Sequence, residues 1–455
     1  MTNLSKQQQI AKSRCYIGAM YLNGCAVDGT RWPEEMLNSV INAAELGFPM
    51  NQNHLPFSAV DQDFSKALEW FTKSSEDDCP EAWNYLGSMY GIGQGVELND
   101  VKATEFFRKS AELGDMTGQH NLGCSLYSGR GIKKDTDAAI EWFNKAAEQG
   151  QHESQFNLGM LHNTKSLKMY DEERAFSWFL KSAQNGNIEA QYIVGTAYMG
   201  NDADCRMAEQ DYTKAVEWYQ KAAGRGHDAA MVNLAWLLMH GLGIEEDKKE
   251  AFRLYDMAAE QGNGHAIYAV AMSYQNGMGV EVDHEKALHI LTSLAEQGFA
   301  DAQHHLGMML IIGDVVEKDT STGVELLKSA INNGSDGAKI DLSACLISGV
   351  SGEIDYAKAI ELISDLVKEG HPGAQFNMAM MYFEGLGIEQ SKSEAVSLFI
   401  KAAEAGEPRA QNNLGLLYME GIGVEKDPVK AKEWLLKASK NKGFESAAMM
   451  FNQTE

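Results

Sequence analysis

The sequence lacks the features that would place a protein in a membrane or on nucleic acid. No run of about 18 apolar residues occurs in the 455-residue chain, which excludes a membrane-spanning helix. Basic residues number 39 against 64 acidic ones, and the net charge is −25 at pH 7. Nucleic acids and anionic membranes bind basic surfaces, so we expect neither as a partner. The acidity fits a basic partner, or it serves only to keep the surface soluble.

Cysteine is also scarce, and its positions are irregular. The six cysteines form no Cys-x-x-Cys pair and share no common spacing. A disulfide framework or a zinc site would need such spacing, so we expect reduced, mostly structural thiols. The first 25 residues lack the charged, apolar and cleavage regions of a secretory signal. We therefore expect a cytoplasmic protein.

Catalytic motifs are missing as well. No Gly-x-Ser-x-Gly sequence and no cysteine–histidine pairing stands out. His284, Glu285 and His289 resemble a zinc-protease motif, but a separation of five positions puts the imidazoles about 140° apart around a helix. The Gly-x-Gly strings follow no strand and lack Lys-Ser/Thr, which excludes a phosphate-binding loop. We expect no enzymatic activity, no cofactor and no metal.

The sequence does contain a long internal repeat. Residues 408–443 read as a helix, a glycine turn and a second helix, and the same pattern recurs back to Pro80 in steps of 36 residues, with one step of 40. A fixed period of this size indicates a repeat solenoid, so we expect one continuous array over 80–443. Its ten units begin at residues 80, 116, 152, 188, 228, 264, 300, 336, 372 and 408.

Each unit follows one physical plan. The first helix carries a Leu-Gly step, as at Leu86-Gly87, whose small residue lets the neighbouring helix approach. Two glycines then end this helix, because glycine adopts the positive φ that a helix C-terminus needs. A side-chain cap opens the second helix. The expected caps are Asp63, Asn99, Asp135, Asp171, Asp211, Asp247, Asp283, Asp319, Asp355, Ser391 and Asp427.

The pattern A-x-x-x-L-G-x-x-Y-x-x-G-x-G-V-x-x-D-x-x-K-A-x-x-W-Y-x-K-A-A-x-x-G closely resembles the Sel1-like repeat family, a relative of the tetratricopeptide repeat with a longer loop. The resemblance covers 80–443 strongly and 11–79 loosely. It implies an all-α, right-handed superhelical solenoid of helix-turn-helix repeats with a period of 36. It also implies a protein–protein adaptor without a shared chemistry. A cysteine-rich branch of the family staples each helix pair with a disulfide, and this chain does not show that pattern.

Both ends of the chain depart from the repeat. Residues 1–79 read as degenerate N-terminal repeats or a cap, in which 11–48 form a poorly matching first unit with its second helix at 35–47. Two prolines favour an irregular segment at 48–61. This segment either belongs to the cap, or folds over the groove or engages a partner. Residues 444–455 begin a further first helix, which we expect to cap the last unit.

The outward positions of successive first helices form stripes. In tetratricopeptide-like arrays these helices line the concave face, so the stripes would follow a groove. Two stripes are rich in methionine and aromatic residues, which adapt to varied apolar surfaces, and a third is rich in asparagine, which can bind a peptide backbone. The same positions could instead be simply core. The candidate partner-binding residues are Phe156, Met160, Tyr192, Trp236, Tyr268, Met272, His304, Met308, Phe376 and Met380.

The sequence therefore predicts a non-enzymatic scaffold or adaptor that binds a protein or peptide partner on its concave face. One alternative is a dedicated inhibitor or immunity-type protein that neutralises one cognate enzyme, because Sel1-like arrays resemble some of these. Another is a β-lactam hydrolase, a chemistry linked to the cysteine-stapled branch, although the missing stapling cysteines speak against it. The sequence does not indicate the oligomeric state.

Overall fold

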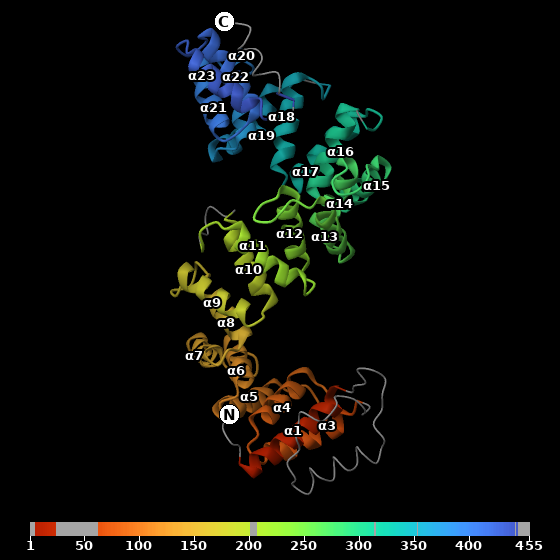
Figure 1. Cartoon of the computed structure of the whole chain (residues 1–455), viewed down its shortest axis with the longest axis vertical. Coiled ribbons are helices and arrows are strands. Elements are labelled where there is room, and N and C mark those ends of the chain that lie inside the picture. Colours follow the sequence, from red (N-terminus) through yellow and green to blue (C-terminus); the bar gives the residue numbers. More distant parts are fainter. Residues whose placement is uncertain are drawn as a thin grey trace. The chain divides into compact units, whose positions relative to one another are not determined.

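The protein is an all-α repeat structure. The computed structural model describes residues 5–23, 62–200, 207–313, 315–352, 354–441 and 443–444. These residues contain 22 helices and no strand (Figure 1). The chain divides into two compact units, Met1–Glu246 and Asp247–Glu455, and the boundary falls within repeat 228–263, between α12 and α13. The expected all-α solenoid of helix-turn-helix repeats is therefore confirmed.

The helices of the two units follow one another in regular pairs. The first unit contains α1 (Lys6–Asn23), α3 (Phe64–Ser75), α4 (Pro80–Ile92), α5 (Asp100–Glu112), α6 (Met116–Ser128), α7 (Thr136–Glu148), α8 (His152–His162), α9 (Glu172–Gln184), α10 (Ile188–Met199), α11 (Tyr212–Ala223) and α12 (Asp228–His240). The second unit contains α13 (Lys248–Glu260), α14 (Gly264–Asn276), α15 (His284–Glu296), α16 (Ala300–Ile312), α17 (Thr320–Asn332), α18 (Asp336–Ser348), α19 (Tyr356–Glu369), α20 (Pro372–Glu384), α21 (Lys392–Glu404), α22 (Pro408–Glu420) and α23 (Pro428–Ala438).

Even-numbered helices from α4 to α22 are the first helices of the repeats, and odd-numbered helices from α5 to α23 are the second helices. The first helices begin 36 residues apart, with one step of 40 between α10 and α12, so the expected period is confirmed.

Side-chain caps open the second helices. Each of the eleven expected cap residues stands at the N-cap and accepts a backbone N–H of the first turn. Asp319 accepts the hydroxyl and the backbone N–H of Thr322, at 2.6 and 3.1 Å. These bonds, the hydroxyl foremost, lower the pKa of the Asp319 carboxyl to about 2. The caps satisfy N–H groups that have no partner within the helix, and so fix where each second helix starts.

Within each pair, the glycine of the Leu-Gly step receives a side chain from the second helix. A Cβ atom at Gly123 would lie 2.7 Å from the ring of Phe143, and one at Gly195 would lie 2.7 Å from the ring of Tyr219. Both rings are fully buried. The absent side chain of glycine therefore makes room for the largest residues of the core.

The second glycine of the turn joins neighbouring repeats. Gly279 has a φ of 79°, and a Cβ atom there would overlap the carbonyl oxygen of Lys248 at the start of the preceding second helix. Glycine is therefore required twice at this position, by the left-handed backbone and by the close approach of another repeat.

The N-terminal helix α1 pairs directly with α3. A Cβ atom at Gly18 would lie 2.7 Å from the ring of Phe71, the same arrangement as in the later pairs. The backbone N–H of Asp63 donates to the carbonyl oxygen of Tyr21 at 2.9 Å, as the equivalent groups do in the next repeat. Helices α1 and α3 therefore act as the first and second helices of one repeat.

Several expectations about the chain ends fall outside the described residues. These are the second helix at 35–47, the irregular segment 48–61 and the cap at 444–455, of which only Phe444 is described. The pairing of α1 with α3 differs from the expected first unit at 11–48. The physical reason is that the residues expected of a second helix stand in α3. Asp63 is the N-cap of α3, and the ring that occupies the space beside Gly18 is that of Phe71.

Candidate functional site

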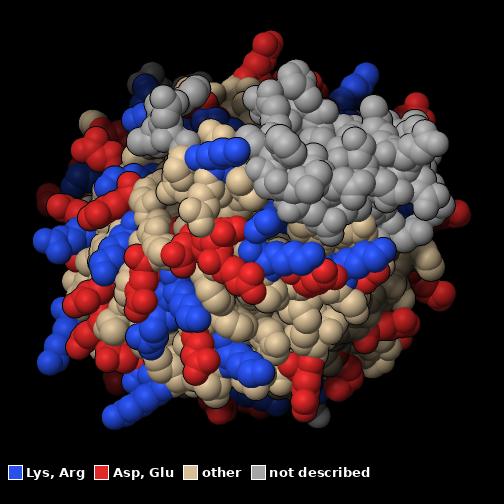
Figure 2. All heavy atoms as spheres, turned by 90° about the horizontal axis from the view of Figure 1, so that it is seen from below, with Lys and Arg blue, Asp and Glu red and all other residues tan. Residues whose placement is uncertain are grey.

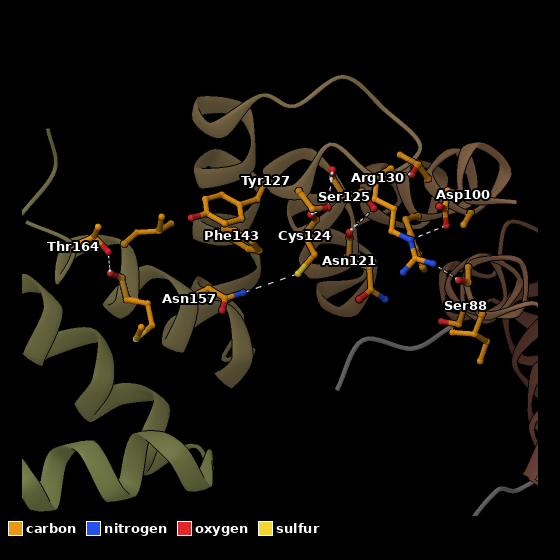
Figure 3. A pocket seen from close by; sticks show the side chains of 18 residues that line it. Ser88, Asp100, Asn121, Cys124, Ser125, Tyr127, Arg130, Phe143, Asn157 and Thr164 are labelled. Atoms are coloured by element: carbon orange, nitrogen blue, oxygen red, sulfur yellow. Dashed lines mark hydrogen bonds and ion pairs between the residues drawn. The ribbon is translucent and has the colours of Figure 1, made fainter. Parts of the chain in front are cut away.

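A pocket of about 680 Å³ lies in the first unit (Figure 3). First helices α4, α6 and α8 and second helices α5 and α7 contribute its lining. Three of its residues are large, apolar and exposed: Ile92, Tyr127 and Met160 are 65, 42 and 44% exposed. A pocket of this size and composition can hold a small ligand or the side chains of a bound peptide.

Hydroxyl groups form much of the polar lining. Ser88 donates to the carbonyl oxygen of Asn84 at 3.1 Å, and Thr164 donates to that of Met160 at 2.7 Å. Ser125 donates in the same way, four residues back along α6. Because each of these hydroxyl protons is used by a backbone carbonyl oxygen four residues earlier, the three oxygen atoms can offer a ligand only acceptor sites. These three positions therefore favour ligand groups that carry N–H or O–H donors, whereas the Tyr127 hydroxyl and the amides of Asn121 and Asn157 can also donate.

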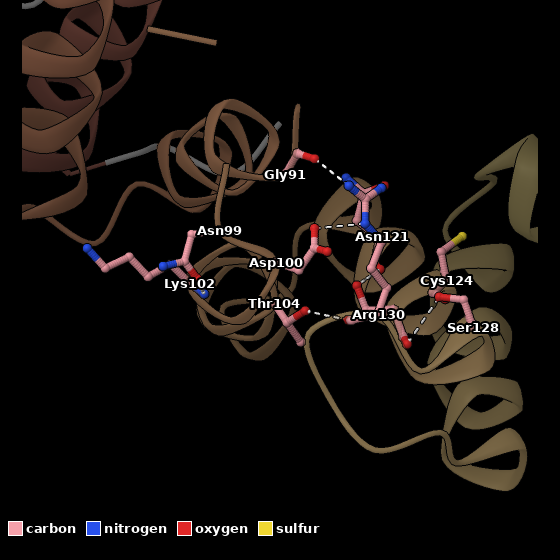
Figure 4. Close-up of polar contacts among 10 residues, drawn as sticks. Gly91, Asn99, Asp100, Lys102, Thr104, Asn121, Cys124, Ser128 and Arg130 are labelled. Atoms are coloured by element: carbon pink, nitrogen blue, oxygen red, sulfur yellow. Dashed lines mark hydrogen bonds and ion pairs between the residues drawn. The ribbon is translucent and has the colours of Figure 1, made fainter. Parts of the chain in front are cut away.

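One ion pair links the pocket wall to the preceding repeat (Figure 4). Arg130 Nε lies 2.7 Å from Asp100 Oδ1, and Arg130 Nη2 donates to the carbonyl oxygen of Gly91 at 2.6 Å. Thr104 Oγ1 donates to the carbonyl oxygen of Arg130 at 3.0 Å. Arg130 is largely exposed, so the pair adds little stability. It orients the turn and neutralises the one carboxylate that lines the pocket.

Cys124 contributes a thiol group to the pocket. Its Sγ lies 3.5 Å from His120 Nε2 and accepts the Asn157 amide at 4.0 Å. Burial raises the pKa of the Cys124 thiol to about 11. The thiol is therefore neutral at pH 7, and it provides a soft, weakly polar surface instead of a nucleophile.

All ten candidate partner-binding residues lie on first helices. Met160 and Trp236 are exposed, at 44 and 38%, and the other eight are half-buried. They are Phe156 and Met160 on α8, Tyr192 on α10, Trp236 on α12, Tyr268 and Met272 on α14, His304 and Met308 on α16, and Phe376 and Met380 on α20. Of these, only Met160 lines the pocket. The half-buried positions have one side available to a partner and one side in the core.

The half-buried residues of the first unit have defined packing partners. The ring of Phe156 lies 5.7 Å from that of Phe179. Tyr192 stacks on His227, with centroids 4.6 Å apart and planes inclined by 21°. Trp236 differs, because its ring contact is with His240 on its own helix, at 4.5 Å.

The second unit uses the same positions to join repeats. His304 Nε2 lies 2.7 Å from Asp341 Oδ2 of the next first helix. The guanidinium of Arg409 lies 4.5 Å from the centre of the Phe376 ring. Tyr268 packs beside Phe299, with centroids 6.1 Å apart. These contacts show that the stripe contributes to packing between repeats as well as to the surface.

The asparagine stripe also links neighbouring first helices. Asn121 donates to Asn84 Oδ1 at 2.7 Å. Asn377, which is only 4% exposed, donates to the carbonyl oxygen of Ile340 at 3.0 Å and to Ser343 Oγ at 2.9 Å. Some of the asparagine amide groups that we expected to bind a peptide backbone are therefore already hydrogen-bonded within the chain.

Sequence reasoning did not identify most of the pocket. Ile92 and Tyr127 lie in the last turns of α4 and α6, outside the stripes that the repeat pattern suggests. Their exposure depends on how adjacent repeats meet, and no periodic pattern marks it. An apolar residue beside the helix-ending glycine is the one local signal that could have identified Ile92.

The charges are mixed on the face displayed in Figure 2, where acidic and basic side chains are interspersed and no broad basic patch is seen among the described residues. Across the described ranges, no group of three or more His, Cys, Asp and Glu side chains is placed to hold a metal ion. None of the helices in those ranges combines the length and apolar character needed to cross a membrane.

Comparisons with known proteins identify structural relatives. No curated protein sequence matches the chain. The solved structure of c5321, a protective antigen present in uropathogenic Escherichia coli strains that displays an SLR fold, is 26% identical, with a TM-score of 0.64. The match covers 100% of this chain and 91% of that chain.

Two further structures align less closely. A Sel1 repeat protein from Oxalobacter formigenes is 29% identical, over 70% of this chain and 90% of that chain, with a TM-score of 0.42. The immunity protein Pa5087 from Pseudomonas aeruginosa is 19% identical, over 51% of this chain and 83% of that chain, with a TM-score of 0.31.

The family model described as the Sel1 repeat matches most of the chain. The matched ranges are 57–79, 80–115, 117–151, 152–187, 188–227, 228–263, 264–299, 300–335, 372–407 and 408–442. Residues 336–371 are not matched, although they form the helix pair α18 and α19. The resemblance seen in the sequence is confirmed: the chain belongs to the Sel1 repeat family, whose solenoid fold typically serves as a non-catalytic scaffold for protein interactions.

Proposed function

We propose that this chain is a non-enzymatic scaffold that holds a protein or peptide partner on the concave face formed by its first helices. The pocket between α4, α6 and α8 carries the proposal. Its exposed residues Ile92, Tyr127 and Met160 gather at one hollow, and apolar side chains gathered in this way mark interaction sites more often than scattered ones do. Methionine and tyrosine are also enriched at protein interfaces.

The partner we propose is rich in donors and basic. The hydroxyl groups of Ser88, Ser125 and Thr164 offer only acceptor atoms, which suit backbone N–H groups or the ammonium and guanidinium groups of a peptide. The net charge of −25 attracts a basic partner from a distance. Attraction of this kind weakens as salt is added, whereas contact with the apolar residues does not.

Trp236 provides a second contact on the same kind of face. It is 38% exposed, and its ring contact is within its own helix, so much of the indole is available to a partner. Exposed tryptophan residues frequently dominate binding energy at interfaces. With Tyr268 and Met272, it represents the stripe expected from the sequence.

Affinity capture from a lysate of the source cells, at low and high salt and with mass spectrometry, tests the proposal. The pocket variant carries Ile92→Ala, Tyr127→Ala and Met160→Ala. The control variant carries Val429→Ala and Leu436→Ala, which remove exposed apolar side chains from second helix α23. We expect one stoichiometric partner that survives high salt, is lost by the pocket variant and is kept by the control.

A second variant separates the stripe from the pocket. Trp236→Ala, Tyr268→Ala and Met272→Ala together should also weaken capture while helicity, measured by circular dichroism, stays unchanged. Unchanged capture by both variants would contradict binding on the first helices. Many weak partners that are lost in salt would mean that net charge alone drives binding. Turnover of a chromogenic β-lactam would contradict the non-enzymatic assignment, and inhibition of a captured enzyme would favour an immunity-type role.

A further inference from the structure

Two buried thiols meet near the N-terminus of the chain. Cys15 on α1 and Cys79, the residue before α4, belong to one hydrophobic cluster and are 5 and 3% exposed. Both cysteines are free, and the Cys79 thiol donates to Glu81 Oε2 at 3.3 Å. Neither cysteine lines the pocket or belongs to the ten candidate partner-binding residues.

The repeat geometry explains why these two positions touch. Cys15 stands three residues before the helix glycine of α1, the position that Tyr192 holds in α10. Cys79 is the N-cap of the following first helix, the position that His227 holds for α12. Tyr192 and His227 stack with centroids 4.6 Å apart. The fold therefore brings these two positions together in more than one repeat, and only here are both of them cysteine.

Polar contacts on α1 hold the two thiols in register. Arg14 Nη1 lies 2.7 Å from Asp77 Oδ2, and both side chains are mostly buried. The Ser74 hydroxyl donates to the carbonyl oxygen of Ala11 at 2.7 Å. The Arg14 contact joins α1 to the segment between α3 and α4, and the Ser74 contact joins α1 to the last turn of α3. These contacts hold the middle of α1 against the end of α3 and the residues that lead to Cys79.

The two thiols differ in acidity. The interaction with the Cys15 thiol lowers the pKa of the Cys79 thiol, against the opposing effects of burial and of the Glu81 carboxylate. The same interaction, together with burial, raises the pKa of the Cys15 thiol. Cys79 also lies at the N-terminus of α4, where the helix dipole favours a negative charge. Cys79 is therefore the attacking thiolate of the pair, and Cys15 is the resolving thiol.

We propose that Cys15 and Cys79 form a redox modification site that closes to an intramolecular disulfide by exchange with a low-molecular-weight disulfide such as oxidised glutathione. The Cys79 thiolate attacks one sulfur of the oxidant, the oxidant's S–S bond breaks and one glutathione thiolate leaves. The Cys15 thiolate then attacks Cys79 Sγ and displaces the second glutathione. Two protein thiols are oxidised, and the oxidant is reduced to two glutathione thiols, which take up the two protons.

The disulfide would tie α1 covalently to the start of α4. The loop closed by this bond includes α3 and all of residues 24–61. Cross-links that close long loops restrict the unfolded chain most, so the bond should stabilise the N-terminal repeats. This inference does not depend on the proposed function.

The test uses the full-length chain and oxidised glutathione. The protein is incubated under native conditions and in denaturant just below its unfolding transition, then blocked with N-ethylmaleimide and analysed by intact mass and peptide mapping. We expect two of the six thiols to be lost, without added mass, and a peptide that joins Cys15 to Cys79. Cys15→Ser and Cys79→Ser should each abolish this product, and the controls Cys124→Ser and Cys345→Ser should retain it.

Several results would overturn the proposal. A stable glutathione adduct that never resolves, a cross-link to another cysteine, or no oxidation in either condition would each do so. The oxidised wild-type chain should also unfold at a higher denaturant midpoint than the reduced chain. This difference should be reversed by dithiothreitol and be absent in Cys15→Ser. An unchanged or lower midpoint would show that the bond does not fit the native structure.

Discussion

In repeat 372–407, a buried glutamine oxygen lacks the hydrogen-bond donor that several other repeats supply. In repeat 300–335, Gln303 Oε1 accepts a hydrogen bond from the side-chain amide of Asn333 at 2.9 Å. Equivalent amide–amide hydrogen bonds occur in two other repeats. Gln375 holds the equivalent position and is 5% exposed. Ala405 stands where the asparagine would be, and Gln375 Oε1 has no hydrogen-bond partner among the described residues.

Ala405→Asn should supply the missing donor. Ala405 has a φ of −76°, close to the −91° of Asn333, and both residues follow the last turn of a second helix. The backbone can therefore accept asparagine without strain. A net hydrogen bond to a buried acceptor contributes about 1 kcal/mol. We expect the free energy of unfolding of this region to rise by about that amount, because Gln375 no longer buries an unpaired oxygen.

Ala405→Asp is the matched control, since aspartate has nearly the same shape but offers no donor at neutral pH. The reverse change, Asn333→Ala, should cost about 1–3 kcal/mol, because it leaves Gln303 Oε1 unpaired. Urea unfolding followed by circular dichroism, with amide hydrogen exchange over α20 and α21, measures the effect locally, because repeat arrays can unfold in parts. Equal stability of Ala405→Asn and Ala405→Asp would refute the reasoning.

Three further predictions concern the repeat framework. Gly123→Ala should lower the free energy of unfolding by about 1–3 kcal/mol, because a Cβ atom would lie 2.7 Å from the buried ring of Phe143. Gly91→Ala, whose nearest contact would be an ordinary 3.5 Å, should raise it by about 0.5–1 kcal/mol, and urea titration of both variants checks the contrast. The folded-state pKa of Asp319 is about 2, below its ordinary 3.8, so the stabilisation from its ionised cap is complete above about pH 4 and lost as the pH falls towards 2. Asp319→Asn keeps an oxygen that can cap the helix but cannot ionise, so it should remove this part of the pH dependence of stability. Unfolding titrations at several pH values that show the same dependence in the variant would contradict the prediction. Burial raises the pKa of Tyr219 and that of Tyr255 to about 12, so ultraviolet titration should show two late-ionising tyrosines, one of which Tyr219→Phe removes.

The framework could be predicted from the sequence because its rules are local. A cap such as Asp427 sits next to the helix that it opens, and the glycines stand where the backbone needs a positive φ. The Leu-Gly step at Gly123 requires only one neighbouring helix, and that helix follows in the same repeat. Each of these features therefore depends only on residues within a single 36-residue unit.

The candidate site could be predicted only in part, because it depends on contacts between units. The stripe position of Tyr192 follows from helical periodicity, but its half-buried state depends on His227 in the next repeat. Ile92 and Tyr127 line the pocket through the spacing of three successive first helices. The repeat pattern of the sequence does not give the distances between neighbouring first helices.

The pairing of α1 with α3 also defines a position for protein engineering. The hydrogen bond from the Asp63 N–H to the Tyr21 carbonyl oxygen brings the chain back to the place where it left α1. Both anchor points are held by their own helices, and the entropy cost of closing a connection grows slowly with its length. We therefore expect that a connection of a different length, such as a short Sel1 turn, can be placed between Asn23 and Gln62 while the helix pair is retained.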